Sequence, residues 1–312
     1  MNSQQTSLTV SIIIPNWNGL HLLKMHLQSV IEAANGAEVI VVDDASNDGS
    51  CEYIKRQYPN VLVIMKDSHE GFPQTVNVGV SRAKGDIVIL LNTDVHPDKN
   101  FLFPLLTHFQ EKEVFAVGCL EQSVESNGTV LRGRGVAKWE RGYYIHKRGE
   151  VDKTDTAWVS GGSGAFRKEI WNKLGGLDPL YSPFYWEDID LSYRAIKMGY
   201  ILRFEPKSTV VHYHALGKIK SIYSMQQINV ISYRNQYIFI WKNADDFSIW
   251  FEHTLWIAIR LFQSMLSGEY AHCLGFLKAL LLSPVIIRRR NQRAVKNKYT
   301  DHQALLRFKQ QL

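Results

Sequence analysis

The sequence predicts an α/β protein whose N-terminal part holds a parallel sheet, followed by a mostly helical C-terminal region. Over residues 8–94, short β-branched runs alternate with segments of helical spacing, and residues 221–283 are mostly apolar with a helical character. The chain has 312 residues, of which 45% are hydrophobic and 21% charged. These are the proportions of a globular protein, so a disordered or fibrous chain is excluded.

The N-terminal part contains four predicted strands, over residues 10–14, 39–42, 61–64 and 87–91. Each is a short run of apolar, often β-branched residues, and Pro15 ends the first. Between them, helical spacing predicts a helix over 20–34 that stops at Gly36, a second helix after residue 50 that is capped by Asp48 or Ser50, and a third over 76–83. Because such βαβ repeats give a parallel sheet, a ligand is expected at the carboxyl ends of the strands.

The rest of the chain changes character twice. Residues 115–215 mix short strands, glycine clusters and aromatic residues, with a helix expected over 187–198 and stopped by Gly199. Beyond residue 221 the chain is apolar and helical. We therefore divide it into residues 8–220, with halves at 8–115 and 116–220, and a helical region at 221–312.

Charge is concentrated at the C-terminal end. Eight of the 36 basic residues but only one of the 30 acidic residues lie between Val285 and Leu312, so the remainder is almost neutral. A nucleic-acid partner is not expected, because its site would spread bases over a folded face. No run of 18 uncharged apolar residues exists, which argues against a conventional membrane span. Residues 247–298 instead fit helices in a membrane interface, with Arg288-Arg-Arg290 against anionic lipid; packing of 247–287 against the sheet is the competing interpretation.

Two further features concern the compartment. The three widely spaced cysteines fit a reducing environment, and residues 1–7 lack the basic segment of a signal peptide. We expect a peripheral protein on the cytoplasmic face of a membrane.

Carboxylates occur at three places where a ligand is expected: Asp43-Asp44 and Asn92-Thr-Asp94 after strands, and Glu187-Asp188 at a helix start. Each has a purely structural interpretation, as an Asx-turn, an ordinary turn or a complement to the helix dipole. The occurrence of all three carboxylate sites in this order, at positions where a ligand is expected, favours a functional interpretation over three separate structural ones. Carboxylates can accept hydrogen bonds from the N–H groups of a nucleotide base or from the hydroxyls of a ribose. Asp94 offers hard oxygen ligands of the kind that suit Mg²⁺ or Mn²⁺.

At this point the sequence resembles the family 2 glycosyltransferases, which have the nucleotide-sugar-binding fold called GT-A, and especially their rhamnosyltransferase-like branch. The resemblance covers roughly residues 8–240 and rests on Ile12–Gly19, Val41–Ser50, Gly71-Phe72, Asn77–Gly79, Gly85–Asp94, Ser160–Arg167, Gly175–Asp178, Trp186–Asp190, Val211-His212 and Tyr233–Tyr237. It implies a Rossmann-like GT-A domain with a helical extension. Asn92 departs from the family's Asp-x-Asp motif, which leaves one fewer charge beside the metal.

The resemblance also implies site residues. It implies nucleotide-sugar binding by Pro15, Asn16, Asn18, Asp43, Asp44, Asn77, Asn92 and Gly162. Asp188 would be the general base, helped by Glu187, and Asp94 and His212 would hold Mn²⁺ or Mg²⁺, with His214 as a competitor for His212. Trp186 is the candidate for stacking on the acceptor sugar, although core packing explains aromatic residues equally well.

The implied activity is an inverting, metal-dependent transfer of a sugar from a UDP- or dTDP-sugar to a glycan or polyprenyl-linked glycan in cell-surface polysaccharide synthesis. Rhamnose is suggested only by the branch. A nicotinamide dehydrogenase and a P-loop kinase are excluded because the chain lacks their glycine-rich motifs. A metal-dependent sugar nucleotidyltransferase and a catalytically silent nucleotide-sugar-binding module remain as alternatives.

Overall fold

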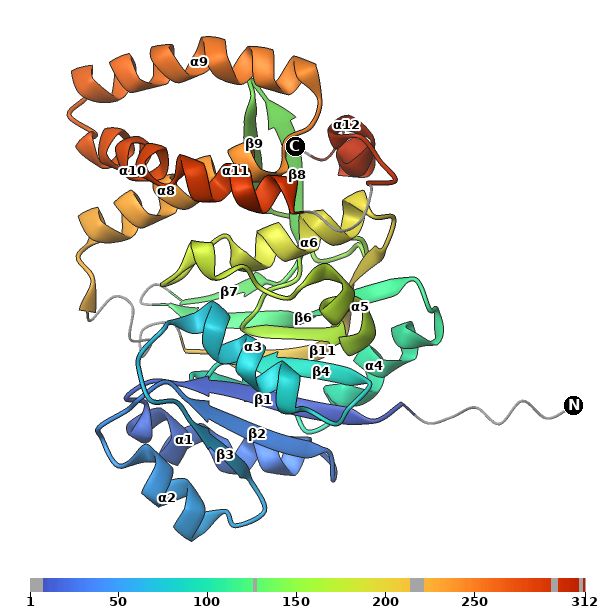
Figure 1. Cartoon of the computed structure of the whole chain (residues 1–312). Coiled ribbons are helices and arrows are strands. Elements are labelled where there is room, and N and C mark those ends of the chain that lie inside the picture. The colour runs from blue at the N-terminus through green and yellow to red at the C-terminus, as the bar shows by residue number, and fades with distance from the viewer. Residues whose placement is uncertain (1–7, 126–127, 214–221, 293–296, 309–310, 312) are drawn as a thin grey trace, which may run out of the picture.

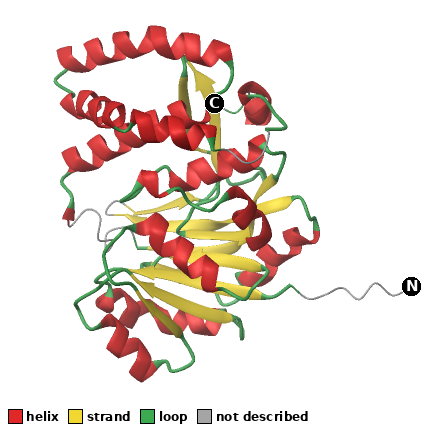
Figure 2. Cartoon of the chain, viewed as in Figure 1, coloured by secondary structure: helices red, strands yellow, loops and turns green. Residues whose placement is uncertain are grey.

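A nine-stranded mixed sheet carries the chain's N-terminal two thirds, and a stack of helices covers one end of it (Figure 1). The computed structural model describes residues 8–125, 128–213, 222–292, 297–308 and 311. Figure 2 separates the layers: strands run through the middle, helices lie on both faces, and the C-terminal part is almost entirely helical. The predicted fold class is confirmed.

The N-terminal half follows the predicted alternation of strands and helices. Its parallel strands are arranged in the order β3-β2-β1-β4. The elements are β1 (Val10–Asn16), α1 (Leu20–Ala33), β2 (Glu38–Asp43), α2 (Ser50–Gln57), β3 (Leu62–Met65), α3 (Phe72–Arg82) and β4 (Ile87–Leu91). Every residue of β4 is buried, as expected for a strand that is covered on both faces. The carboxyl ends of β1, β2 and β4 therefore lie along one edge.

The second half of the sheet is mixed. Strand β10 pairs antiparallel with both β4 and β6, and it joins the two halves into the order β3-β2-β1-β4-β10-β6-β11-β5, with β7 on β6. The elements are β5 (Val95–Pro97), α4 (Leu102–Thr107), β6 (Val114–Glu125), β7 (Gly128–Arg132), β10 (Ser163–Arg167), α5 (Lys168–Leu174), α6 (Glu187–Lys197) and β11 (Ile201–His212). A separate hairpin consists of β8 (Gly135–Glu140) and β9 (Tyr143–Arg148).

The C-terminal region consists of helices, as predicted. They are α8 (Met225–Asn243), α9 (Phe247–Leu266), α10 (Tyr270–Leu281), α11 (Ser283–Asn291) and α12 (Asp301–Leu305). Helices α8 and α10 pack closely because Gly275 has no side chain: a Cβ there would lie 2.6 Å from the Cβ of Tyr233. Helix α9 is the outermost element of the stack (Figure 1), and only three of its side chains, Ile249, His253 and Ser264, are buried.

The basic C-terminal end differs from the free tail that the charge distribution suggested. Asp301 and Phe308 are fully buried, and Arg290 donates to the carbonyl of Trp241 at 3.1 Å and to Asp245 at 3.0 Å. Arg290, one of the three adjacent arginines, is thus engaged by backbone carbonyls near the end of α8 and by the carboxylate of Asp245. Arg288 and Arg289 remain exposed, whereas Arg293, Lys296 and Lys309 lie outside the described residues.

No single described helix has the length and hydropathy of a membrane span. The bent pair α10 and α11, which meet at 59°, reaches that threshold only when the two helices are taken together.

Candidate active site

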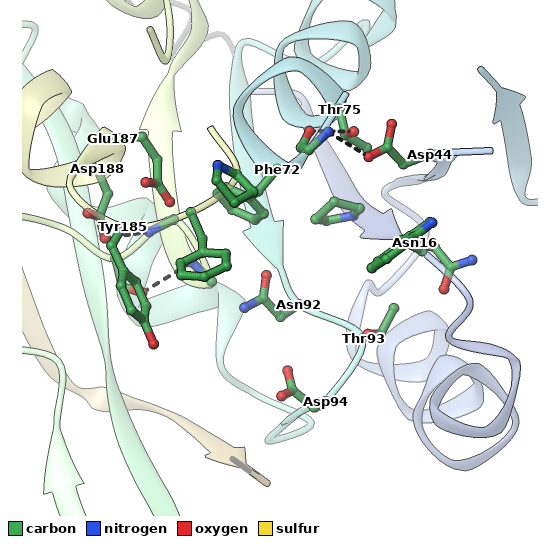
Figure 3. Close-up of a pocket in the computed structure, with 18 of the residues that line it drawn as sticks. Asn16, Asp44, Phe72, Thr75, Asn92, Thr93, Asp94, Tyr185, Glu187 and Asp188 are labelled. Carbon is green, nitrogen blue, oxygen red and sulfur yellow. Dashed lines mark hydrogen bonds between the residues drawn. The ribbon is translucent and has the colours of Figure 1, made fainter. Parts of the chain in front are cut away.

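A pocket of about 380 Å³ opens at the carboxyl ends of β1 and β4. Its walls also include Leu22 of α1, Asp44 after β2, the loops before α3, before β10 and before α6, the end of β11, and Ile222 and Tyr223 before α8. Figure 3 shows Asp44 on one side, Glu187 and Asp188 on the opposite side, and Asn92 and Asp94 between them. The three carboxylate sites predicted from the sequence therefore meet in one cavity.

Asp44 anchors the loop that forms one wall of this pocket. Its carboxylate accepts from Lys66 Nζ at 2.6 Å and from the backbone amides of Glu70 at 3.0 Å and Gly71 at 2.8 Å. Burial opposes ionisation of Asp44, but these donors outweigh it and lower the pKa of the carboxyl below its usual value. Asp44 therefore stays charged.

Two stacked aromatic rings, those of His69 and Trp17, lie beside the Asp44 carboxylate. His69 Nδ1 lies 2.8 Å from Asp44 Oδ2, and the His69 imidazole stacks on the Trp17 indole with centroids 3.9 Å apart. Both rings line the pocket, and the His69 side chain is 38% exposed. This corner therefore already holds a flat ring that presents a nitrogen to a carboxylate and stacks on an indole.

Two residues predicted for nucleotide binding instead use their side chains in hydrogen bonds that close the turn after β2. Asp43 is buried, with one oxygen accepting from Asn16 Nδ2 at 2.7 Å and the other from the Ser46 amide at 2.9 Å. Asn18 adopts a left-handed φ of 48°, and its Oδ1 accepts from the Asn47 amide at 2.9 Å. Neither lines the pocket, because both side chains are consumed in closing the turn after β2.

Asn77 is a third residue that was predicted for nucleotide binding but is engaged elsewhere. Its amide pairs with the backbone of Leu177, donating to the carbonyl at 2.7 Å and accepting from the N–H at 3.0 Å. It connects α3 to the loop after α5 and does not line the pocket. Pro15 and Asn16, by contrast, do line it, as predicted.

Asn92 and Gly162 form a matched pair at the floor of the pocket. The backbone N–H of Asn92 donates to the Gly162 carbonyl at 3.0 Å, and a Cβ at position 162 would lie 2.7 Å from the side-chain Nδ2 of Asn92. Glycine at 162 thus leaves room for the Asn92 side chain. The sequence predicted both residues for the site but not their contact.

Asp94 and His212 come from distant parts of the chain to adjacent positions on the pocket wall. Asp94 Oδ1 lies 3.2 Å from His212 Nε2, and Glu121 Oε1 lies 3.2 Å from His212 Nδ1. Burial by itself would lower the pKa of His212, but the two carboxylates raise it to about 9. His214, the competing candidate, lies outside the described residues.

This cluster fits two ligands of a divalent cation. Oxygen from Asp94 is a suitable donor, and so is the imidazole nitrogen of His212 once a cation displaces its proton. Glu121 is placed to orient the ring through its other nitrogen. Among the described residues, no group of three His, Cys, Asp or Glu side chains is arranged to hold a metal by itself. Further ligands would have to come from a substrate or water, as is usual for cations that bind phosphates.

Glu187 and Asp188 begin α6 on the opposite wall. Asp188 accepts from the Ile189 amide at 2.8 Å and lies 3.4 Å from the Gly161 amide. Burial raises the pKa of Asp188 above its ordinary value in spite of these amides, and burial together with the neighbouring charge of Asp188 raises that of Glu187 well above its own. Glu187 Oε2 is buried and accepts no hydrogen bond from a described residue. A carboxylate whose pKa is moved toward neutrality is suited to proton transfer.

Trp186 does not occupy the position predicted for it. Its side chain is 5% exposed and packs against Tyr144, His146 and Phe239, so the core interpretation holds. The preceding residue, Tyr185, lines the pocket and is 40% exposed. Because Trp186 has a left-handed φ of 77°, the backbone turns between the two and sends their rings to different places.

Several residues that line the pocket were not predicted for the site from the sequence: Trp17, His69, Thr75, Pro183, Ile222 and Tyr223. Trp17 stands between two residues that were selected, so its position was a usable signal. His69 and Tyr223 lie in loops without periodicity, and nothing in the sequence distinguishes them.

Comparisons with known proteins agree with this geometry. Residues 11–175 match the model of the family described as glycosyl transferase family 2. N-acetylgalactosaminyltransferase 7 of Drosophila melanogaster is 25% identical over 65% of this chain, which spans only 39% of that protein. N-acetylglucosaminyl-diphospho-decaprenol L-rhamnosyltransferase of Mycobacterium tuberculosis is 24% identical over 64% of this chain and 75% of its own.

Solved structures extend the likeness to the fold. GalNAc-T7 with UDP, GalNAc and Mn²⁺ superposes with a TM-score of 0.61 at 22% identity, covering 78% of this chain and 49% of that one. The mannosyltransferase PcManGT from Pyrobaculum calidifontis, in complex with GDP-Man and Mn²⁺, gives a TM-score of 0.56 at 18% identity, covering 90% and 76%. The sheet and its covering helices are therefore those of GT-A glycosyltransferases.

Proposed function

The chain belongs to glycosyl transferase family 2, and from that premise we propose that it transfers a sugar from a nucleoside-diphosphate donor to a hydroxyl of a glycan or lipid-linked glycan, with inversion at the anomeric carbon. The observation that carries the proposal is the arrangement in Figure 3: Asp44 and Asp188 face each other across one pocket, with Asp94 between them. This spacing leaves room for a nucleotide at one end and an acceptor at the other.

The nucleobase would bind where His69 and Trp17 now stack. A pyrimidine is also a flat ring with an N–H donor, so it can stack on Trp17 and donate to Asp44 Oδ2 once the half-exposed His69 ring moves aside. A UDP- or dTDP-sugar meets this requirement. The adjacent Lys66 and backbone amides keep Asp44 ionised for that contact.

The diphosphate would extend toward Asp94 and His212. None of the described residues that line the pocket is a lysine or arginine, so the protein offers the phosphates little positive charge of its own. Mn²⁺ or Mg²⁺ held by Asp94 and His212 would supply charge neutralisation for the leaving diphosphate. Carboxylate, phosphate and water oxygens suit Mn²⁺ and Mg²⁺ alike.

Asp188 would act as the general base. A sugar hydroxyl is a weak nucleophile at neutral pH, so a carboxylate must take its proton as the new bond to the anomeric carbon forms and the bond to the diphosphate breaks. Burial and the neighbouring charge of Asp188 raise the pKa of Glu187, so Asp188 is the member of the pair that ionises more readily. Tyr185 replaces Trp186 as the residue we propose to contact the acceptor, because its ring is exposed to the pocket.

A sugar nucleotidyltransferase is the less favoured alternative. Its substrate would be a nucleoside triphosphate, which carries more negative charge than a diphosphate, and the described pocket lining lacks the bases to bind it. A silent binding module has no need for a carboxylate whose pKa is raised toward neutrality, which is what Asp188 provides.

We also propose that the protein works as a peripheral protein at the cytoplasmic face of a membrane, where a polyprenyl-linked acceptor would be presented. The support is a stripe along α9 of six exposed apolar side chains at spacings of three or four residues: Phe247, Phe251, Leu255, Ile259, Phe262 and Leu266. Helix α10 adds exposed Leu277 and Leu281 beside Lys278. With Arg288 and Arg289 exposed on α11, the region has both apolar and basic groups for anionic lipid.

Membrane binding is tested by co-sedimentation with vesicles. Replacing both Phe251 and Leu255 by Asp should release the protein from phosphatidylcholine–phosphatidylglycerol vesicles, whereas Leu62→Asp, at an exposed apolar position on the far sheet edge, should not. Binding to phosphatidylcholine alone should be weaker for the wild type. Unchanged sedimentation of the double variant would reject this surface.

The activity is tested with a panel of UDP-, dTDP- and GDP-sugars, scored for donor hydrolysis and thermal shift in the presence of Mn²⁺. We expect one nucleotide class to raise the melting temperature and one sugar to be released. Cleavage of a nucleoside triphosphate with a sugar phosphate would instead support the nucleotidyltransferase.

A further inference from the structure

The wall of the pocket next to Asp188 is formed by a loop that the sheet domain does not hold by itself. Residues 181–186 lead into α6, and Pro183, Phe184 and Tyr185 line the pocket. Tyr185 and Trp186 have φ values of 71° and 77°, which a residue with a side chain rarely adopts. Such a backbone persists only when its surroundings fix it.

Helix α8 supplies those contacts through one side chain. Asn235 is fully buried, and its Nδ2 lies within hydrogen-bonding distance of the carbonyls of Tyr181 at 2.8 Å, Phe184 at 3.0 Å and Tyr185 at 2.9 Å. An amide nitrogen that faces three carbonyls of one loop holds the loop at both ends. Because the acceptors are backbone atoms, the contact fixes the path of the chain rather than any particular side chain.

The neighbouring residue orients that amide. Arg234 Nε donates to Asn235 Oδ1 at 2.9 Å, so the carbonyl side of the amide is occupied and the NH₂ side faces the loop. Arg234 also donates through Nη2 to the carbonyl of Ser182. Four carbonyls of the loop, at 181, 182, 184 and 185, are thus bound by two consecutive residues of α8.

We propose that Arg234 and Asn235 are positioning residues for the proposed transfer reaction: they fix the loop at 181–186 and thereby the direction in which Asp188 and Tyr185 face the pocket. The proposal rests on the proposed function for its kinetic consequence. Neither residue lines the pocket, and neither contacts Asp44 or Asp94, so the nucleotide end should be unaffected by their loss.

The test is the hydrolysis kinetics of the donor identified in the panel, with water as acceptor. Asn235→Asp places a carboxylate against the loop carbonyls and should lower kcat about tenfold or more while the donor KM stays within twofold, because only the base end is displaced. Arg234→Lys keeps the charge but loses the bond that orients Asn235, and should give a smaller fall in kcat with the same unchanged KM. It also serves if Asn235→Asp does not fold.

Tyr237→Phe is the matched control. Its hydroxyl is a buried hydrogen-bonding group on the same helix, 2.8 Å from His272 Nε2, and it does not touch the loop. It should lower the melting temperature without changing kcat. A kcat within twofold of wild type for both Asn235→Asp and Arg234→Lys would overturn the positioning role. An equal fall in the kcat of Tyr237→Phe would overturn it as well.

Amide hydrogen exchange separates failure of this inference from failure of the proposed function. If the wild type cleaves no donor, the proposed function fails, and exchange still decides whether α8 holds the loop. Asn235→Asp should accelerate exchange at 184–188 and leave 44–50 unchanged, and Tyr237→Phe should change neither segment. Equal exchange at 184–188 in the wild type, Asn235→Asp and Tyr237→Phe would contradict the proposal that α8 holds the loop.

Discussion

Asp190 on α6 and Lys242 on α8 form a buried ion pair of 3.0 Å, two residues beyond the proposed base. Asp190 also accepts from Arg194 at 2.8 Å and from Asn243 at 2.7 Å. Although burial alone would raise its pKa, the charges of Arg194 and Lys242 lower it far below the usual range. Buried ion pairs therefore connect α6, the helix that carries the proposed base, to α8 of the C-terminal region.

Asp190→Asn should destabilise the protein by about 3 kcal/mol, because it leaves Lys242 and Arg194 with less compensation in a buried site. Urea unfolding measures this. The carboxyl's pKa is lower in the folded state, so the difference from wild type should be constant above the usual Asp value of 3.8 and shrink as the pH falls below it. Glu140→Gln, which removes an exposed ion pair with Lys138, should cost about 0–1 kcal/mol.

Asp188→Asn should reduce turnover about 10²-fold or more and leave donor affinity within a few-fold, since the base is used only in the chemical step. Steady-state kinetics and calorimetric titration with UDP separate the two effects. Asp152→Asn, an exposed acid outside the pocket, is the control. Unchanged turnover would remove Asp188 from its role.

The pH dependence of kcat should have an acidic limb governed by the pair of Glu187 and Asp188. Burial raises the pKa of both carboxyls, so the active ionised form should be lost as the pH falls through a midpoint above the usual Asp pKa of 3.8. A pH–rate profile measured at saturating donor shows this. A midpoint below 3.8 would mean that Asp188 is not the ionising group.

Asp94→Ala should abolish the Mn²⁺ dependence of UDP binding, because it removes the oxygen ligand. Glu121→Gln, which keeps the shape of the side chain but removes the charge behind His212, should weaken Mn²⁺ affinity about tenfold. Calorimetry with and without Mn²⁺ distinguishes these cases. Equal UDP binding by the wild type under both conditions would count against the cation.

Gly162→Ala should lower donor affinity about tenfold, because the new methyl group would lie 2.7 Å from Asn92 Nδ2 and force that side chain from the pocket floor. The double variant with Asn92→Ala provides the control: once the side chain is gone, Gly162→Ala should cost nothing further. Additive losses in the double variant would show that the clash is not the cause.

The sequence alone determined the strands and helices of the N-terminal half, since fully buried strands and amphipathic helices leave strong periodic patterns. It also placed Asp44, Asp94 and Asp188 at one site, because parallel strands end at a common edge and the family resemblance supplied the third group. Only the tertiary structure decided how each side chain is used. Asp43 and Asn77 share the residue types of the side chains that line the pocket, but the turns and loops that fold against them satisfy their hydrogen bonds.

The tertiary structure also decided where the rings of Tyr185 and Trp186 lie and which groups engage the basic residues near the C-terminal end. A left-handed backbone at Tyr185 and Trp186 sends one ring into the pocket and the other into the core, and no local pattern reports that turn. The charge run at Arg288–Arg290 was visible in the sequence, but the carbonyls and the carboxylate that engage Arg290 come from α8 and the turn after it. Periodicity records which residues are buried together, whereas the partner of a polar group depends on segments that only the folded chain brings close.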